Sequence, residues 1–274
     1  MSLRAALFAG LGTKLFRAEL RADRPGRLCG LPEALAFLDG LGITVDFYLP
    51  EGSDVETNTL VLSVTGTAAG IAAVEEGLTG CLAKPSGIAT AAAAASALAA
   101  PRSTIVCGSY KKVDARLKAV YRRAVELGGA RSRMLEGRPF VYLDKTHIRL
   151  LGSVQAAAAA ARAAAGPEPA LVIQIHRVTG SLEAEVEAAL AVGAHVLMVD
   201  TGCEADLIRC RGLLDADGRR SGDEPLVAFA GDIKMEAIPR CRDLGADIIC
   251  LGKAIIDAPM LDFHLDVLDA GAGG

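Results

Sequence analysis

Apolar runs alternate strictly with amphipathic stretches in the sequence from about residue 100 onward. The runs, rich in Val, Ile and Leu, lie at 103–109, 139–145, 170–178, 194–202, 225–233 and 246–254. The stretches between them lie at 111–127, 153–165, 181–192, 204–214 and 234–244. Their apolar residues recur three and four positions apart, which predicts helices, and strands that alternate with helices predict a parallel sheet. We therefore expect an α/β fold with a six-unit parallel barrel over residues 100–262, closed or nearly closed.

The first part of the sequence follows a different pattern. Strands are predicted at 16–22, 43–49 and 59–64, a helix at 31–41, a turn at 50–54 and an alanine-rich helix from about Ser86. These elements predict a compact α+β sandwich module over residues 1–99, because turn residues separate short strands from helices. The C-terminal segment 263–274 is expected to join this module.

Composition narrows the class of protein. The chain is 51% hydrophobic with a formal charge of −4, so it can bury a core and is not expected to bind nucleic acid in general. Its seven cysteines form no CxxC pair, which argues against a disulfide framework or zinc knuckle. The N-terminus lacks a signal-peptide pattern and no apolar run is long enough to cross a bilayer, so a soluble cytoplasmic protein without membrane contact is expected.

Polar residues gather where the predicted barrel strands end, which is the active face of parallel α/β barrels. The strand ends offer Lys111, Lys112, Asp144, Lys145, His147, His176, Arg177, Asp200, Gly231, Asp232, Gly252 and Lys253. Cationic side chains and open glycine backbone both favour a phosphorylated anion. Asp200 would suit ribose hydroxyls or a hydrated Mg²⁺, and His147 and His176 are candidate acid or base groups. Any single charge can be a solvated loop residue, but their recurrence at successive strand ends favours a site. His195 lies early in a strand and is expected to be structural.

Several short motifs occur in a characteristic order along the chain. They include LCGLP at 28–32, PEGSDV at 50–55, SGIAT at 86–90, KTHI at 145–148, VDT at 199–201 and AGDI at 230–233. In this order they resemble the quinolinate phosphoribosyltransferase (nicotinate-nucleotide pyrophosphorylase) family from about residue 15 to residue 268. The resemblance implies a type II phosphoribosyltransferase-like fold, with the α+β module preceding the barrel.

The resemblance also implies an activity. Members of this family transfer the phosphoribosyl group of phosphoribosyl pyrophosphate to a pyridine nitrogen, use Mg²⁺ and release CO₂. It implies that Lys145 and Asp200 are catalytic, with Lys145 on the pyrophosphate side and Asp200 as the ribose or metal carboxylate, and the strand-end position of His176 adds it as a third catalytic candidate. It further implies that Arg133 binds the acceptor and that Gly231 and Gly252 cradle the 5′-phosphate, and the strand-end positions add Lys111, Lys112, His147, Asp232 and Lys253 as expected substrate-binding residues. A homodimer is implied as well, in which the small module of one chain covers the barrel mouth of its partner.

Several positions depart from the family pattern. Glu75-Glu76-Gly77 stands at the family's Glu-Arg-Thr, Ser109–Lys112 at its Thr-Arg-Lys-Thr, Ser132 at its histidine, and Gln174–His176 at its Glu-Val-Glu. Quinolinate carries two carboxylates, and each lost charge-assisted contact would cost on the order of 2 kcal/mol. We therefore expect the acceptor to be another small aromatic acid or heterocycle.

Three alternatives remain open from sequence. The chain can be an ordinary quinolinate enzyme with an unusual site. It can be a repurposed phosphate-binding barrel that uses Lys145 or Lys253 for carbonyl or decarboxylation chemistry. It can also be a non-catalytic homologue, and whether Glu75 or Glu76 enters the site is not determined by sequence.

Overall fold

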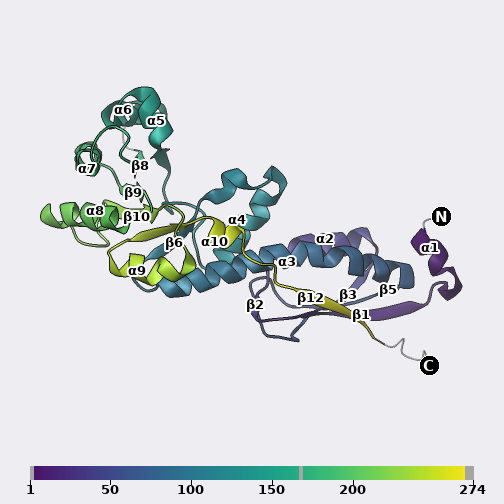
Figure 1. The fold of residues 1–274 in the computed structure, drawn as a ribbon. Helices are drawn as coiled ribbons and strands as arrows, with labels where there is room; N and C mark the ends of the chain where they lie inside the picture. The colour runs from purple at the N-terminus through teal and green to yellow at the C-terminus, as the bar shows by residue number, and fades with distance from the viewer. Residues whose placement is uncertain (1–2, 167–168, 269–274) are drawn as a thin grey trace. The chain divides into compact units, whose positions relative to one another are not determined.

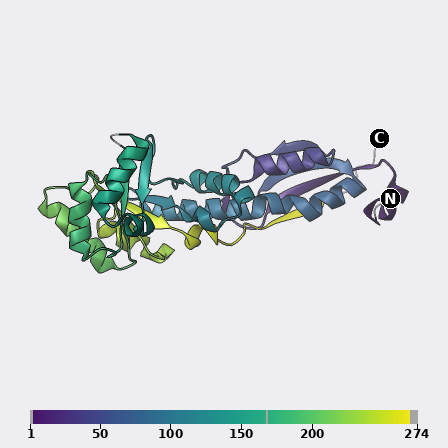
Figure 2. The same cartoon turned by 90° about the horizontal axis from the view of Figure 1, so that it is seen from above.

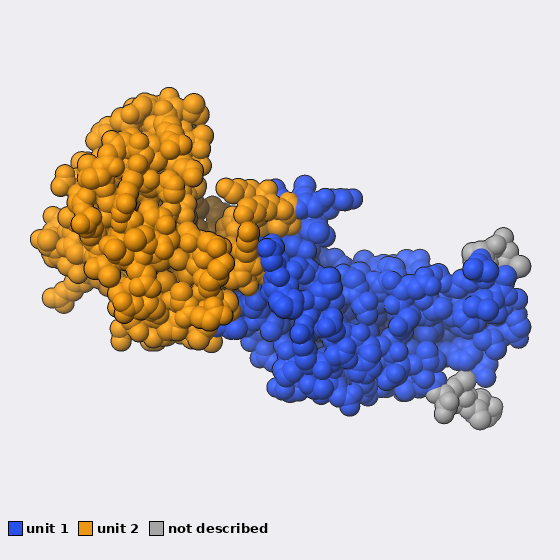
Figure 3. Space-filling model, in the orientation of Figure 1, with its two compact units in different colours: residues 1–94, 114–129, 256–274 blue, residues 95–113, 130–255 orange. Residues whose placement is uncertain are grey.

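The computed structural model describes residues 3–166 and 169–268. These residues form two compact units, shown in blue and orange in Figure 3. Unit 1 contains the described residues of 1–94, 114–129 and 256–274, and unit 2 those of 95–113 and 130–255. Each unit has its own main sheet, and the two sheets differ in strand direction.

The main sheet of unit 1 is antiparallel and has four strands in the order β12-β1-β5-β3. The strands are β1 (Leu15–Ala22), β3 (Thr44–Tyr48), β5 (Leu60–Thr67) and β12 (Phe263–Val267), and β2 (Gly26–Arg27) pairs separately with β4 (Asp54–Val55). Side chains in the second half of β1 alternate between buried and partly buried positions, the pattern of a sheet with one covered face. A short helix, α1 (Leu3–Leu7), and a 3₁₀ turn (Ala9–Leu11) precede the sheet.

Helices α2 (Leu31–Gly40) and α3 (Ala68–Ala99) lie against the strands of unit 1 in Figure 2. The prediction that the alanine-rich helix begins near Ser86 is wrong, because α3 begins at Ala68 and continues through Pro85. Proline normally interrupts a helix. The side chains of Val74, Leu78 and Leu82 are nevertheless fully buried in the core, and this packing stabilises the helix on the amino-terminal side of the proline.

The main sheet of unit 2 is parallel, with the order β6-β11-β10-β9-β8-β7. Its strands are β6 (Thr104–Cys107), β7 (Phe140–Leu143), β8 (Ala170–Ile175), β9 (Val196–Asp200), β10 (Leu226–Ala230) and β11 (Ile248–Leu251). Every barrel strand expected from the apolar runs is present, and the predicted α/β fold is confirmed.

The helices of unit 2 lie around the outside of this sheet in Figure 1. They are α5 (Lys145–Leu151), α6 (Val154–Ala165), α7 (Leu182–Ala191), α8 (Glu204–Ala216) and α9 (Ile238–Asp243), and a further short helix, α10 (Lys253–Ile256), follows β11. The helix predicted at 111–127 is only partly correct, because 3₁₀ turns at Ser109–Lys112 and Ala115–Leu117 precede α4 (Lys118–Leu127). Asp114 lies between those two turns. Its carboxylate accepts a hydrogen bond from the backbone N–H of Arg116 and so caps the second turn.

The barrel does not close. Strands β6 and β7 are the two edges of the sheet, and no pairing between them is found in the described part of the chain. Arg131 occupies the free edge of β6, where its N–H donates to the carbonyl of Ile105 (2.8 Å) and its carbonyl accepts from Cys107 (2.9 Å). Because this segment takes the edge hydrogen bonds of β6, the expectation of a closed or nearly closed barrel is corrected to a six-stranded half-barrel.

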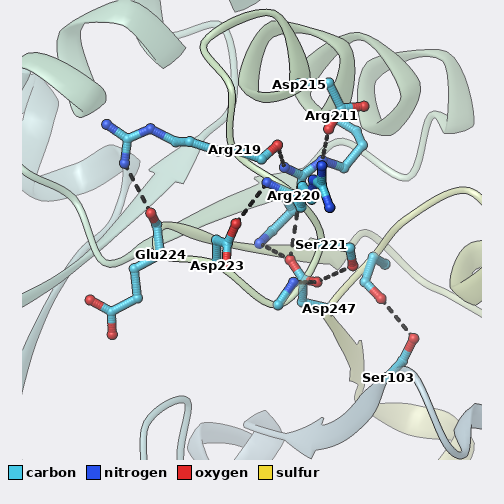
Figure 4. A network of polar contacts seen from close by, with 12 residues as sticks. Ser103, Arg211, Asp215, Arg219, Arg220, Ser221, Asp223, Glu224 and Asp247 are labelled. Atoms are coloured by element: carbon cyan, nitrogen blue, oxygen red, sulfur yellow. Dashed lines mark hydrogen bonds and ion pairs between the residues drawn. The ribbon is translucent and has the colours of Figure 1, made fainter.

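A polar network around the buried side chains of Asp247 and Arg211 lies at the amino end of the strands in unit 2 (Figure 4). The carboxylate of Asp247, which immediately precedes β11, accepts hydrogen bonds from Ser221 Oγ (2.5 Å), Gly222 N (2.8 Å) and Val227 N (2.8 Å). Arg211 of α8 approaches the same carboxylate at 3.6 Å. The network connects the loop before β10 to the start of β11.

The seven cysteines are all free thiols. Across residues 3–166 and 169–268, none of the helices combines the length and apolar character needed to cross a membrane.

Candidate active site

A cavity of about 760 Å³ opens at the carboxyl end of the strands of unit 2, a size that suits a small organic ligand. Its lining includes the predicted site residues Lys111, Lys112, Arg133, Lys145, Asp200, Gly231, Asp232, Gly252 and Lys253. Apart from Arg133, which lies in the segment before β7, these residues lie at or just after the ends of five strands, β6, β7, β9, β10 and β11, that are far apart in the sequence. The folding of the parallel sheet therefore gathers them at one place.

The cavity has an exposed cationic rim and a less accessible interior. Lys111, Lys112, Arg133 and Lys253 are exposed, whereas Lys145 and Asp200 are half-buried. Asp232 adds a carboxylate to the rim, where Lys234 Nζ lies 2.8 Å away. The hydrogen bond and charge of Lys234, followed by the charge of Lys253, lower the pKa of Asp232. The rim thus combines ionised carboxylate with an excess of cationic groups.

Lys145 occupies the first position of α5, and Asp144 caps this helix. The Asp144 carboxylate accepts hydrogen bonds from the backbone N–H groups of Thr146 (2.8 Å) and His147 (3.0 Å). Burial acts to raise the pKa of Asp144, but the hydrogen bonds from His147 and Thr146 outweigh it and lower that pKa. An ionised cap is favourable at a helix N-terminus, so Asp144 fixes the backbone that carries Lys145.

His147 does not line the cavity. Its ring Nδ1 lies 2.8 Å from the Asp144 carboxylate and 3.4 Å from the backbone N of Asp144, and the second contact completes a reciprocal capping arrangement. The side chain predicted to bind substrate is therefore engaged in the helix cap. The sequence could not separate these roles, because both require a histidine just after the end of β7.

Gln174, His176, Lys145 and Asp200 form a connected group across β7, β8 and β9. Gln174 accepts from the backbone N–H of Lys145 (2.6 Å) and donates to Asp200 Oδ2 (2.5 Å). His176 Nδ1 lies 2.5 Å from the Asp200 carbonyl oxygen, and its Nε2 lies 3.5 Å from Lys145 Nζ. A carbonyl only accepts, so Nδ1 carries a hydrogen, and Nε2 is the ring nitrogen that faces the lysine. His176 therefore contacts the Lys145 side chain but does not itself line the cavity.

Backbone approaches the cavity closely at Gly231 and Gly252. A Cβ atom at Gly231 would lie 2.2 Å from Gly202 N, and the residue has φ +116°, which an L side chain rarely adopts. A Cβ at Gly252 would lie 2.3 Å from Ser109 Oγ. Both positions keep backbone free of side-chain atoms at the rim, the arrangement that oxygen-rich anions use.

Replacing Gly231 by alanine is expected to weaken binding of inorganic phosphate at least about tenfold and to lower the unfolding free energy by about 2 kcal/mol. The new methyl group must displace backbone of the loop that follows β9. Gly218→Ala is the control, because Gly218 also has positive φ (+80°) but no atom lies within 4 Å of its Cβ position. Equal losses in the two variants, measured by calorimetry and urea unfolding, would contradict the crowding argument.

The floor of the cavity is apolar and polarisable. It is formed in part by Met134, Phe140, Tyr142, Met198 and Cys250. Burial, followed by the charge of Asp200, raises the pKa of Tyr142, and burial raises the pKa of the Cys250 thiol to about 12. Both groups are therefore neutral near pH 7, and Tyr142 Oη donates to Met198 Sδ at 3.2 Å.

Arg133 lies beside this floor. Its guanidinium carbon is 5.6 Å from the centroid of the Phe140 ring, within the range of a cation–π contact. The floor residues were not among the predicted site residues, because apolar side chains in strands resemble ordinary core. Gln174 carried a usable signal, since an amide inside an otherwise apolar strand needs a hydrogen-bond partner.

Comparisons with known proteins agree with this architecture. The chain matches the family descriptions "Quinolinate phosphoribosyl transferase, N-terminal domain" over residues 4–86 and "Quinolinate phosphoribosyl transferase, C-terminal domain" over residues 88–266. It is 32% identical over 265 residues to the nicotinate-nucleotide pyrophosphorylase (carboxylating) of Homo sapiens, covering 95% of this chain and 84% of the human protein. The corresponding Rattus norvegicus protein is 30% identical, with 96% and 86% coverage.

Solved structures give the same result. NadC from Streptococcus pyogenes superimposes with a TM-score of 0.76 at 26% identity, covering 93% of this chain and 88% of that one. The nicotinate-nucleotide pyrophosphorylase from Pyrococcus furiosus has a TM-score of 0.82, with 96% and 72% coverage, and at 22% identity it supports the fold. With both family regions matched in order and a half-barrel of the same topology, the chain belongs to the quinolinate phosphoribosyl transferase family, a family of phosphoribosyltransferase enzymes.

Proposed function

We propose that this enzyme transfers the phosphoribosyl group of phosphoribosyl pyrophosphate to a small aromatic acid or heterocycle other than ordinary quinolinate. The observation that carries the proposal is the composition of the cavity. A cationic, glycine-bearing rim adjoins a neutral floor that holds Phe140 and Tyr142, with one arginine in the lining. The rim suits the anionic donor, and the floor suits a flat ring.

In this proposal the donor occupies the rim. Gly231 and Gly252 leave backbone accessible to the 5′-phosphate, and Lys253 and Asp232 stand beside them. Lys145, with Lys111 and Lys112, would bind the pyrophosphate through charge-assisted hydrogen bonds. Transfer breaks the bond from the anomeric carbon to pyrophosphate oxygen and forms a bond from that carbon to a ring nitrogen.

Asp200 would act on the ribose as this exchange proceeds. Positive charge develops at the anomeric carbon when pyrophosphate departs, and a fixed carboxylate stabilises it without reorganisation. Gln174 donates to Asp200 Oδ2 and so holds the carboxylate in one orientation. Lys145 would counter the negative charge that grows on the departing pyrophosphate.

Mg²⁺ is compatible with these residues as an ion that arrives with the donor. No cluster of three or more His, Cys, Asp or Glu side chains able to hold a metal occurs among residues 3–166 and 169–268. Mg²⁺ is commonly held by one or two carboxylates together with substrate phosphates. Asp200 would supply the protein ligand, and the ion would neutralise charge on the pyrophosphate.

The acceptor assignment rests on Arg133. It is the arginine that lines the cavity, and its guanidinium stacks near Phe140, so one carboxylate of an aromatic acid could be bound beside a ring. A lysine cannot reproduce the bidentate grip that a second arginine gives a second carboxylate. This supports an acceptor with fewer than two strongly bound carboxylates. The homodimer and the cytoplasmic location remain predictions.

Isothermal titration of phosphoribosyl pyrophosphate with Mg²⁺ tests the donor site. Wild-type protein is expected to bind at micromolar Kd, and Lys145→Ala is expected to weaken binding about tenfold or more, since a charge-assisted contact is lost. Lys118→Ala is the matched control, because Lys118 lies at the start of α4 and does not line the cavity.

The absence of wild-type binding, with and without candidate acceptors, would refute the transferase proposal. Trapping of a carbonyl substrate on Lys145 or Lys253 by borohydride would then favour lysine-based chemistry. Donor binding without turnover on a panel of aromatic acids and heterocycles would instead indicate a non-catalytic homologue.

A further inference from the structure

Glu185 is a buried carboxylate with an unusual set of partners. It lies in the first turn of α7 and is 2% exposed. Its Oε2 accepts from the backbone N–H groups of His176 (2.9 Å) and Arg177 (2.8 Å), and its Oε1 accepts from those of Val178 and Thr179. One side chain therefore binds four consecutive backbone amides of the loop that follows β8.

This loop has a backbone conformation that needs such support. Arg177 has φ +54°, a left-handed conformation that is uncommon for a residue with a side chain. The amide groups of 176–179 converge on the Glu185 carboxylate, which satisfies both the donors and the buried charge. The backbone conformation at His176, just after β8, thus depends on the hydrogen bonds that Glu185 accepts.

His176 connects this loop to two residues that line the cavity. Its ring contacts the Asp200 carbonyl through Nδ1 and Lys145 Nζ through Nε2. Lys145 and Asp200 are the half-buried charged residues assigned above to pyrophosphate and ribose. A change in the backbone at residue 176 would rotate or displace the ring and with it the nitrogen that faces the lysine.

We infer that Glu185 is a positioning residue: it fixes the loop after β8 so that His176 holds Lys145 in place for the anionic donor. The inference rests on the proposed function, because it assigns Lys145 to the pyrophosphate. Glu185 does not line the cavity and is not a catalytic group. Its effect is transmitted through the backbone N–H of His176.

Asp206 provides a matched control. It is also a 2% exposed carboxylate close to the same loop, but it forms an ion pair with the Arg177 side chain, whereas the backbone N–H of His176 donates to Glu185. Glu185→Gln and Asp206→Asn each neutralise one buried carboxylate with little change in size. Both are expected to lower the urea midpoint, because each leaves donors or a cation without its partner.

The test uses the full chain labelled with ¹⁵N-histidine and a calorimetric titration with inorganic pyrophosphate. The four histidines give resolvable ring signals, and His176 is assigned by its loss in His176→Asn. In wild type and Asp206→Asn, His176 is expected to show a single tautomer protonated at Nδ1. In Glu185→Gln it is expected to show a mixture, with pyrophosphate affinity at least about fivefold weaker than in Asp206→Asn.

Unchanged His176 signals in Glu185→Gln, with an affinity equal to that of Asp206→Asn, would overturn the inference and leave Glu185 a structural residue. If Glu185→Gln does not fold, Glu185→Asp replaces it with the same two outcomes, because it keeps the charge but shortens its reach. If wild type binds no pyrophosphate, the assignment of Lys145 to pyrophosphate fails, and the His176 signals still decide whether Glu185 positions the ring.

Discussion

Replacing Asp200 by asparagine is expected to reduce kcat for phosphoribosyl transfer by about 10²- to 10³-fold, or roughly 3–4 kcal/mol of transition-state stabilisation. The substitution removes the negative charge beside the anomeric carbon while nearly preserving side-chain shape. An asparagine oxygen can still accept from Gln174 Nε2, which lies 2.5 Å from Asp200 Oδ2 in the wild type. The variant is therefore expected to fold normally, and, because Asp200 would also hold the Mg²⁺ that arrives with the donor, to lose donor affinity by a smaller factor than it loses kcat.

Steady-state kinetics with the acceptor found by screening, together with donor titration, separate these effects. Asp243→Asn is the control, because Asp243 is an exposed residue at the end of α9 that pairs with Arg242. It is expected to keep wild-type kcat. The assignment of Asp200 to the transition state would be contradicted if Asp200→Asn raised the donor Kd without changing kcat.

The strand–helix alternation was sufficient to predict the architecture of unit 2. Runs such as 170–178 and 194–202 correspond to β8 and β9 with errors only at their ends. Parallel strands buried on both faces produce continuous apolar runs, and this signal is local in sequence. That the barrel stays open was not predictable in the same way. It depends on the pairing of Arg131 with the edge of β6, and apolar periodicity gives no information about this contact.

The predicted helix boundaries were wrong where tertiary packing overrides the local helix preference of the sequence. The sequence around Pro85 predicts a helix start, but burial of Val74 and Leu78 extends α3 back to Ala68. The short helix α5 was missed because its cap depends on side-chain hydrogen bonds of Asp144 and His147. Such hydrogen bonds depend on side-chain orientation, which a propensity argument does not contain.

The site residues that lie at the ends of the parallel strands could be predicted from sequence. Lys145, Asp200 and Gly231 could be placed at one rim because parallel strands end together. The floor formed by Tyr142 and Met198 could not, since polar or aromatic groups within a strand can face either the core or a cavity. The contacts of Glu185 could not be predicted for a further reason. Its partners are backbone N–H groups, which every residue except proline carries.

The largest effect on stability is expected for Asp247→Ala, which should lower the free energy of unfolding by about 3–5 kcal/mol. The substitution leaves the donors of Ser221, Gly222 and Val227 without the carboxylate they share (Figure 4). It also leaves Arg211, which is 7% exposed, without its buried counter-charge. Arg211 Nη1 has no hydrogen-bond partner in the described part of the chain, so the Asp247 carboxylate at 3.6 Å is the counter-charge that faces this nitrogen.

Asp215→Ala separates the buried contribution from the exposed one. Asp215 also binds Arg211, through Nε at 3.0 Å, but its side chain is 59% exposed. Its loss is therefore expected to cost less than about 1 kcal/mol. Urea unfolding of both variants measures the difference, and similar shifts would show that Asp247 contributes no more than a surface ion pair. Pyrophosphate affinity per folded molecule should stay at the wild-type value in both, because the network lies at the amino end of the strands and the cavity at their carboxyl end.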